Sequence, residues 1–194
     1  MAKNWKKRHN LSRKTEANLI SIGIGIVIGI VVIISVIGIM QLISKNKKNV
    51  KPKTFSYEIN ENDEIIINGL SDWGKDSTII VIPETIEGKT VVEIADNAFS
   101  NNNNITNVTL PDSLERIGNR SFYNCSKLSS LDLPDSLVYV GSECFANSGI
   151  ETISFPKGMV SVGINACLNI NKVQYYSGTV TGAPWGAISE EILR

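Results

Sequence analysis

VTLPDSLERIGNRSFYNCSKL (residues 108–128), LDLPDSLVYVGSECFANSGI (131–150) and ISFPKGMVSVGINACLNINKV (153–173) are three versions of one phrase. The phrase returns after 23 and then 22 residues, and a looser copy precedes it, so that the marker prolines are Pro83, Pro111, Pro134 and Pro156. A period of this length is typical of a solenoid, in which each coil buries its apolar side only against its neighbours. The repeat therefore predicts a mainly β or α+β solenoid.

Several residue columns repeat in phase with the prolines. The first apolar column consists of Ile86, Leu114, Leu137 and Met159, and the second of Ile94, Ile117, Val140 and Val162. An aromatic column, Phe99, Phe122, Phe145 and then Cys167, follows a small residue in every copy, and an asparagine column follows it at Asn101, Asn124, Asn147 and Asn169. We predict that the phenylalanines supply the buried area. The asparagine amides are expected to hydrogen-bond the turn backbone of their own and adjacent coils.

The residues before each proline have the form of a strand, LxxLxL, as in Leu128–Leu133 and Ile150–Phe155. Stacked coils would join these strands into a parallel sheet with a spacing of about 4.8 Å per coil. Proline would end each strand because it removes a donor from the ladder. The carboxylates of Asp112 and Asp135, directly after the proline, are expected to cap the turn that follows.

The two ends of the array lack the full pattern. FSYEI (55–59) and EIIING (64–69) flank turn-forming residues and predict a hairpin, so residues 55–78 are interpreted as an N-terminal cap. About four repeats fill residues 79–176, and residues 177–194 are interpreted as a closing cap. Trp73 is a candidate for covering the first coil, the alternative being a half-buried loop aromatic. Trp185 is a candidate for covering the last coil, the alternative being a position on a partner surface.

Charge is strongly segregated although the chain is neutral as a whole. Residues 1–53 hold eleven Lys and Arg and one acidic residue, whereas residues 54–194 hold eight basic and eighteen acidic residues. The acidic part disfavours nucleic acid as a partner. Residues 19–43 carry no charge, and as a helix they would span about 37 Å, enough to cross a bilayer. We expect a basic tail (1–18), an uncleaved single-pass membrane anchor (19–43) and a Lys-rich linker (44–54).

The orientation of this anchor is predicted with the N-terminus in the cytoplasm and the repeats outside the cell. Basic residues on the two sides are nearly balanced by count, so the short N-terminal tail and the resemblance described below decide the orientation. Ser21, Gly25 and Gly29 lie at four-residue spacing, as in helix pairs that dimerise in lipid, while the alternative is that glycine is simply common in membrane helices.

Catalytic chemistry has little support in the sequence. His9 is the single histidine and lies in the basic tail, which excludes a Ser-His or Cys-His pair and a His-ligated metal within the repeats. The three cysteines, Cys125, Cys144 and Cys167, contain no CxxC pair and fall in columns predicted to be buried, so inert thiols are expected. We predict no catalytic residues, no cofactor and no metal site.

The phrase LPDSLERIGNRSFYNCSKL resembles the leucine-rich repeat of BspA-like bacterial surface proteins. The similarity extends over about residues 55–186, including the IPETIEGKTVVEIADNAF opening and the APWGA close. The resemblance implies a surface interaction module, similar to an adhesin, and brings no catalytic residues with it. This chain differs in having about four copies and in having an N-terminal anchor in place of a cell-wall sorting motif.

A binding surface, if the repeats carry one, is expected at the outward positions between the repeated columns. The candidates are Thr106, Asn107, Thr109, Ser130, Asp132, Tyr139, Thr152 and Ser154. The alternative is that Thr and Ser are simply good solvent-facing strand residues. The favoured function is a membrane-anchored, non-enzymatic module that binds a protein or glycan at the cell surface. The second is an envelope-assembly protein that dimerises through Ser21, Gly25 and Gly29.

Overall fold

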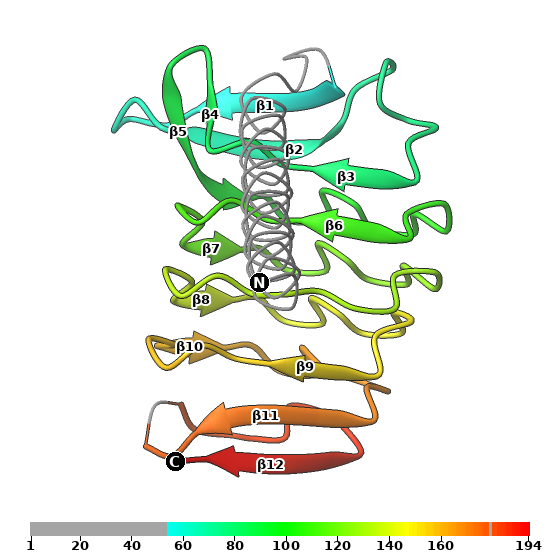
Figure 1. The fold of residues 1–194 in the computed structure, drawn as a ribbon, viewed down its shortest axis with the longest axis vertical. Helices are drawn as coiled ribbons and strands as arrows, with labels where there is room; N and C mark the ends of the chain where they lie inside the picture. Colours follow the sequence, from blue (N-terminus) through cyan, green and yellow to red (C-terminus); the bar gives the residue numbers. More distant parts are fainter. Residues whose placement is uncertain (1–53, 179) are drawn as a thin grey trace, which may run out of the picture. The chain divides into compact units, whose positions relative to one another are not determined.

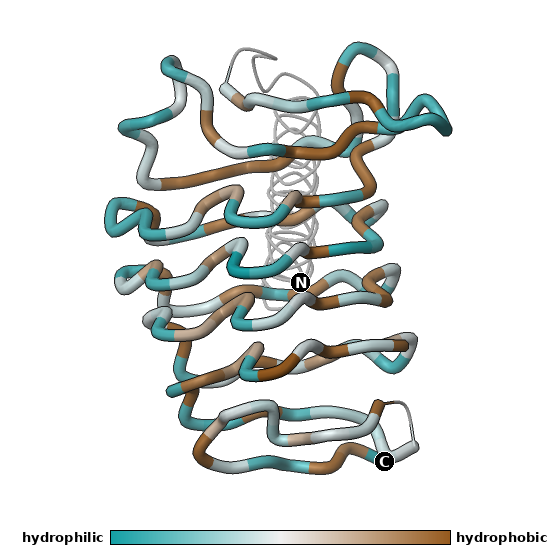
Figure 2. The backbone as a smooth tube through the Cα atoms, turned by 180° about the vertical axis from the view of Figure 1, so that it is seen from behind, coloured by the Kyte–Doolittle hydropathy of each residue, from teal (hydrophilic) through white to brown (hydrophobic). Residues whose placement is uncertain are grey.

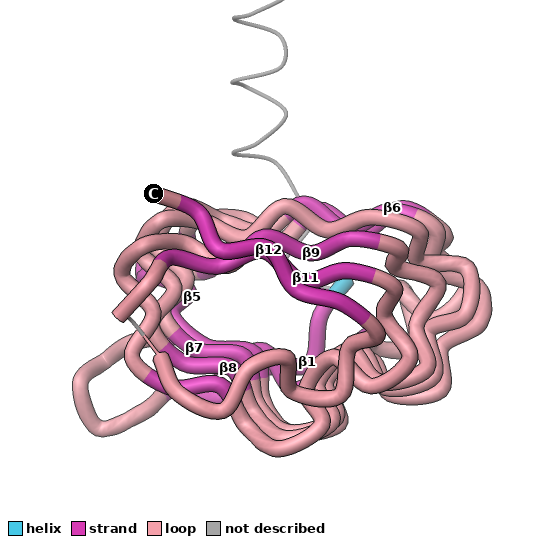
Figure 3. The backbone as a smooth tube through the Cα atoms, turned by 90° about the horizontal axis from the view of Figure 1, so that it is seen from below, coloured by secondary structure: helices cyan, strands magenta, loops and turns pink. Residues whose placement is uncertain are grey.

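The computed structural model describes residues 54–178 and 180–194, and every regular element in these ranges is a β-strand. The chain winds through successive coils, each of which crosses two opposite walls (Figures 1 and 3). The predicted membrane anchor and the Ser21, Gly25 and Gly29 contact lie outside these ranges. Within residues 54–178 and 180–194 there is no helix long and apolar enough to span a bilayer.

One wall, which we call the isoleucine wall, passes through the second apolar column. Its strands are β1 (Phe55–Ile59), β2 (Ile65–Leu70), β5 (Lys89–Ile94), β7 (Arg116–Ile117), β8 (Tyr139–Val140) and β10 (Ser161–Val162), hydrogen-bonded in that order. From β2 onward all neighbours are parallel. A side branch, β4 (Thr85–Ile86), pairs antiparallel with β5 and accommodates the extra residues of the first copy. The sequence reading treated this column as buried side chains only and missed the sheet.

The opposite wall, the proline wall, is formed by strands that precede the marker prolines and by two further strands nearer the C-terminus. It contains β3 (Ile79–Val81), β6 (Asn107–Thr109), β9 (Thr152–Ser154), β11 (Lys172–Tyr176) and β12 (Ser189–Leu193). These form a two-stranded sheet, β3 with β6, and a separate three-stranded sheet, β9 with β11 and β12. The predicted parallel sheet is therefore present but interrupted. The expected strand at Leu128–Leu133 is wrong, because no strand forms there.

The core between the walls is continuous and follows the predicted columns. Phe122 is fully buried, and its ring stacks on Phe99 at 5.3 Å and on Phe145 at 6.0 Å between centroids. The phenylalanine column is thus confirmed. Hydrophilic residues lie mainly in the turns at the sides of the coils (Figure 2).

The asparagine column lies in the turns that carry the phenylalanines, which we call the phenylalanine turns. Its role there differs from the predicted one. Asn101, Asn124, Asn147 and Asn169 all have left-handed backbone, with φ of 60°, 57°, 57° and 70°. Asparagine tolerates this conformation better than most residues because its short side chain bonds locally. The amides bond to one another instead of to backbone, Asn124 donating to Asn101 at 3.0 Å and Asn169 to Asn147 at 2.6 Å. The backbone N–H groups reach the next coil themselves, as from Asn124 to Ala146.

Both predicted ends are present, with changes. β1 and β2 form the expected antiparallel hairpin, and β2 continues directly into the isoleucine wall. Trp185 is 5 % exposed and packs edge-on against Phe155 and Tyr175, as expected for a residue that covers the last coil. The tail also adds β12 to the proline wall, so it extends the sheet as well as closing it. Trp73 is 80 % exposed, so the prediction that it is buried over the first coil is wrong.

Candidate interaction surface

The candidate binding residues divide between the two walls. Most belong to the proline wall, where they lie on or beside β6 and β9 or in the segment between these strands: Thr106, Asn107, Thr109, Ser130, Asp132, Thr152 and Ser154. All of these are exposed except Thr109, which is half-buried. Tyr139 belongs to β8 in the isoleucine wall. The structure therefore brings seven of the eight predicted residues onto one wall and separates Tyr139 from them.

The proline wall is broken where the third coil crosses it. Residues 129–133 occupy the position of a strand between β6 and β9, yet their backbone makes no hydrogen bond to either neighbouring coil among the described residues. The composition supplies a reason. Thr106 precedes β6 and Thr109 is its last residue, whereas Ser129 and Asp132 stand in the same columns of the third coil, and Ser and Asp fit a pleated surface less well than Thr.

A cleft opens at this break. Its volume is about 300 Å³, and its walls come from the second and third coils: Asn107, Val108, Thr109, Leu110, Asp112, Asp132, Leu133 and Pro134. The lining combines two carboxylates, one amide and one hydroxyl with apolar side chains. No basic side chain lines the cleft. This combination can accept hydrogen bonds from hydroxyl or amino groups and can cover a small apolar surface.

The carboxylates in this cleft are not needed by the fold. Within the described residues neither Asp112 nor Asp135 caps its turn through its side chain, which contradicts the capping prediction. The hydroxyls of the following residues bond to the preceding coil, Ser113 donating to the Val91 carbonyl at 2.8 Å and Ser136 to the Leu114 carbonyl at 2.6 Å. The Glu84 carboxylate also accepts the backbone N–H groups of Asp112 and Ser113. The Asp112 side chain therefore stays available to a ligand.

The outer face of the isoleucine wall is chemically different. The guanidinium of Arg116 lies 4.0 Å from the ring centroid of Tyr139, and it also approaches Glu93 at 3.4 Å. A neighbouring arginine, Arg120, pairs with Glu143 at 2.8 Å. Charges on this face are thus largely matched by partners on adjacent coils, and Tyr139 is already covered on one side. This wall offers fewer unused polar groups than the cleft.

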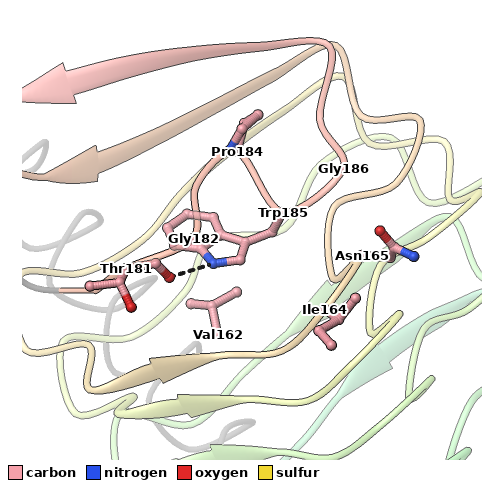
Figure 4. A pocket seen from close by; sticks show the side chains of 8 residues that line it. All are labelled: Val162, Ile164, Asn165, Thr181, Gly182, Pro184, Trp185 and Gly186. Carbon is pink, nitrogen blue, oxygen red and sulfur yellow. Dashed lines mark hydrogen bonds between the residues drawn. The ribbon is translucent and has the colours of Figure 1, made fainter.

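A second cleft, which the sequence reading missed, lies at the C-terminal end (Figure 4). It has a volume of about 310 Å³ and is lined by Val162, Ile164, Asn165, Thr181, Gly182, Pro184, Trp185 and Gly186. The indole N–H of Trp185 donates to the Thr181 carbonyl at 3.1 Å, so its polar group is used within the fold. The lining carries no charge, and Trp185 is needed for covering the last coil. We assign this cleft to packing of the final coil.

The cysteines are structural. All three are buried and free, and desolvation raises the pKa of Cys125 to about 11 and that of Cys167 to about 12. Burial also raises the pKa of Cys144 far above its ordinary range. A thiol in this state is protonated at neutral pH and is neither a nucleophile nor a metal ligand. In the described part of the chain no group of three His, Cys, Asp or Glu side chains is placed to hold a metal ion.

Comparison with known proteins agrees with this architecture. Two solved structures resemble the chain with a TM-score of 0.53. The leucine-rich repeat protein of T. pallidum is 21 % identical over 71 % of this chain and 79 % of its own. A leucine-rich repeat protein from Bacteroides capillosus is 22 % identical over 73 % of this chain and 96 % of its own. At these identities the likeness establishes the fold. A search of curated proteins returned no match.

A family comparison identifies the repeat itself. The BspA-type leucine-rich repeat region matches residues 78–181 in six copies. The sequence analysis counts about four because it relies on the proline and phenylalanine markers, and the coil of β11, for example, has no marker proline after its strand. The match agrees with the repeated phrase at residues 108–128, with the strands of the isoleucine and proline walls, and with the stacked phenylalanine column. The chain belongs to the BspA-type leucine-rich repeat family.

Proposed function

We propose that this chain is a membrane-anchored repeat module that binds a protein or glycan at the cell surface through the cleft in the proline wall. The observation that carries the proposal is the interruption of that wall at residues 129–133. There the fold leaves backbone groups and the Asp112 and Asp132 carboxylates without a structural task, beside apolar side chains. Repeat proteins commonly bind on an extended face of this kind.

The chemistry of the cleft favours a ligand that presents hydroxyl or amino groups. Asn107, Thr109 and two carboxylates supply mainly hydrogen-bond acceptors, and no basic lining residue competes for the acids. A sugar or a basic, polar loop of a protein fits this lining, whereas an anionic ligand would be repelled. The net negative charge of residues 54–194 acts in the same direction.

The experiment compares three full-length chains in proteoliposomes. The wild type, a cleft variant carrying Asp112→Ser and Asp132→Ser, and a control carrying Glu58→Ser and Glu61→Ser are each applied to a glycan array and to solubilised envelope proteins. The control removes the same charge from exposed hairpin positions far from the cleft in the sequence. We expect one class of ligand to be lost by the cleft variant alone. Equal retention by all three chains would exclude the cleft as the binding site.

Anchoring and orientation form part of the same proposal. Residues 19–43 would cross the membrane once, with the N-terminus in the cytoplasm and the repeats outside. Protease added to intact cells should then remove residues 54–194 and leave the N-terminal tail protected. Complete protection of the repeats would reverse the orientation, and recovery of the chain in the soluble fraction would exclude the anchor.

A further inference from the structure

The strand β12 forms an open edge of the proline wall. It pairs with β11 on one side, and in the described part of the chain no strand pairs with its other side (Figure 1). The backbone N–H of Ser189 donates to the Asn171 carbonyl beside β11 at 3.0 Å. Since backbone groups point alternately to the two sides of a strand, those of Glu190 and Ile192 face the open side. Such an edge is a template for pairing with another chain.

The core-facing side of this edge carries both charges and an apolar residue. The register places Glu190 beside Val173 and Ile192 beside Tyr175, and both of these neighbours on β11 are buried. Glu190 and Ile192 therefore lie in columns that face the core in the preceding coil. Arg194 follows two residues after Ile192, on the same side by alternation. Along the edge the order is thus Glu, Ile, Arg, and all three residues are exposed.

The two charged residues of this edge are not used within the chain. None of the ion pairs in the described residues involves Glu190 or Arg194. The Tyr175 hydroxyl donates to one oxygen of the Glu190 carboxylate at 3.0 Å, which fixes its position and leaves the second oxygen available. Glu191, on the outward side of the same strand, is in contrast matched by Lys172 and by a hydrogen bond from Gln174 at 2.8 Å.

The order Glu, Ile, Arg is complementary to itself when two copies of β12 run antiparallel. With a two-fold axis at Ile192, Glu190 of each copy lies opposite the partner's Arg194, and the two Ile192 side chains lie opposite each other. The open backbone groups of the two strands also face one another in this register. A register centred on Glu191 would instead place two carboxylates opposite each other, which is unfavourable.

We propose that the open edge of β12 is an interface between two copies of this chain, paired antiparallel about Ile192 and held by Glu190 and Arg194. A symmetric contact of this kind closes on itself as a dimer. It covers Ile192, which is 53 % exposed in the single chain. The Glu190 carboxylate loses water on pairing, and the partner's guanidinium compensates that loss through a charge-assisted hydrogen bond.

This inference goes beyond the proposed ligand binding and does not depend on it. The cleft is lined by residues of the second and third coils, so pairing at the last coil leaves it uncovered. Failure of the dimer would therefore leave the cleft proposal standing, and failure of ligand binding would leave the dimer standing.

The test is disulfide cross-linking of the full-length chain in detergent micelles, with empty micelles in excess. Ile192→Cys places the two thiols directly opposite each other, at a Cα separation of about 5.5 Å that a disulfide can bridge. Ser189→Cys is the matched control, because the two copies of residue 189 would lie about 20 Å apart in the same register. The three native cysteines are buried and should not react.

We expect the cross-linked fraction of Ile192→Cys to exceed that of Ser189→Cys at least fivefold under a mild oxidant. Equal cross-linking at the two positions would reflect random encounters and would overturn the proposal. Absence of cross-linking at position 192 would also overturn it, provided that the native thiols still resist a disulfide reagent and so report a folded chain.

Reversal of the charges tests the pairing of Glu190 with Arg194. In the Ile192→Cys background, Glu190→Arg and Arg194→Glu should each lower the cross-linked fraction to the control level, because they bring like charges together. The two changes combined should restore it. Glu191→Arg, an equal change of charge on the outward side, should have less than a twofold effect. A double variant no better than either single variant would contradict the assigned register.

Discussion

The two walls of the solenoid are made by the same coils, yet one is continuous and the other is interrupted. In the isoleucine wall the second, third and fourth coils are each bound to the preceding coil through a glycine amide, as from Gly118 to Ile94 and from Gly141 to Ile117, both at 2.8 Å. In the proline wall the third coil makes no such bond. The comparison shows that the residues of the isoleucine wall are restricted by contacts between coils, whereas those of the proline wall can vary.

The difference lies in how closely the backbones approach. A Cβ added at Gly118, Gly141 or Gly163 would lie 2.4, 2.4 or 2.3 Å from atoms of the preceding coil, so the isoleucine wall admits only glycine there. The prolines of the other wall end each strand but impose no comparable contact on the residues before them. Those residues can change without loss of the fold. A repeat protein thus keeps its scaffold on one wall and varies the other.

The largest expected effect comes from removing the ring at the centre of the core. Phe122→Ala should lower the free energy of unfolding by about 3–5 kcal/mol, because the ring is fully buried and stacked on both sides. Denaturant unfolding of the detergent-solubilised chain, followed by Trp185 emission, measures it. Tyr139→Ala, an outward change in the isoleucine wall, is the control and should cost less than about 1 kcal/mol. Equal losses would contradict the assigned core.

Adding a methyl group in the isoleucine wall should lower the free energy of unfolding almost as much as Phe122→Ala does. Gly141→Ala places a Cβ 2.4 Å from the backbone nitrogen of Asn119 and forces the two coils apart, so we expect a loss of about 3 kcal/mol or failure to fold. The same change at Gly158, where the nearest atom would lie at 3.5 Å, is the matched control in the turn after Pro156. Gly158→Ala should be close to neutral. A tolerated Gly141→Ala would mean that this wall is as adaptable as the other.

The asparagine column should respond to backbone conformation more than to lost hydrogen bonds. Asn124→Ala puts a side chain with no local acceptor at φ 57° and should cost about 1–2 kcal/mol. Asn124→Gly also removes the amide contact to Asn101 but relieves the left-handed residue, so we expect a smaller loss. Denaturation midpoints of the two variants separate the effects. A more costly glycine would show that the amide contact to Asn101 dominates.

The smallest effect concerns the buried thiols and appears only at high pH. Because folding raises the pKa of Cys125 and Cys167 to about 11 and about 12, the unfolded thiols ionise first. The contribution of these thiols to the free energy of unfolding should be fully present below their ordinary pKa of 9.0 and should be lost progressively as pH rises through the folded values. Native thiols should also resist a disulfide reagent at pH 8 and react at once in denaturant. Rapid reaction of the native chain would contradict their burial.

Cys144→Ala gives the matched control for this pH dependence. Residue 144 stands in the column of small residues that also contains Ala98 and Ala166, so alanine should fit without a large cavity. The variant should lose one unreactive thiol and part of the alkaline destabilisation. An unchanged alkaline profile would mean that Cys144 contributes nothing to it.

The repeat columns could be predicted because they are local and periodic. Phe99, Phe122 and Phe145 recur in phase with the prolines, and burial of the large ring is the simplest reason for a repeated phenylalanine. Trp185 was likewise placed correctly over the last coil. Sequence reasoning fails where hydrogen bonds between coils decide the structure. The LxxLxL pattern is the same at 128–133 as at 150–155, yet only the second contains a strand.

Only part of the candidate binding site could be predicted from the sequence, for the same reason. Outward positions follow from alternation, so Asn107, Thr109 and Asp132 could be named as candidates, but the break that turns them into a cleft depends on coils that fail to pair. A signal did exist in the comparison with the second coil, since Ser129 and Asp132 stand where that coil has Thr106 and Thr109. The exposure of Trp73 could not be deduced, because nothing in LSDWGKD distinguishes a covering residue from one that faces outward.

Hydrogen exchange of the full-length chain tests the contrast between the walls most directly. The amides of Gly118 and Gly141, bonded to the preceding coil, should exchange orders of magnitude more slowly than the amides of residues 129–133, which lie in the same coil as Gly141. Slow exchange in the isoleucine wall together with fast exchange at 129–133 is the predicted result. Comparable protection of both would mean that the proline wall is closed, and the cleft and the proposed binding site would be lost with it.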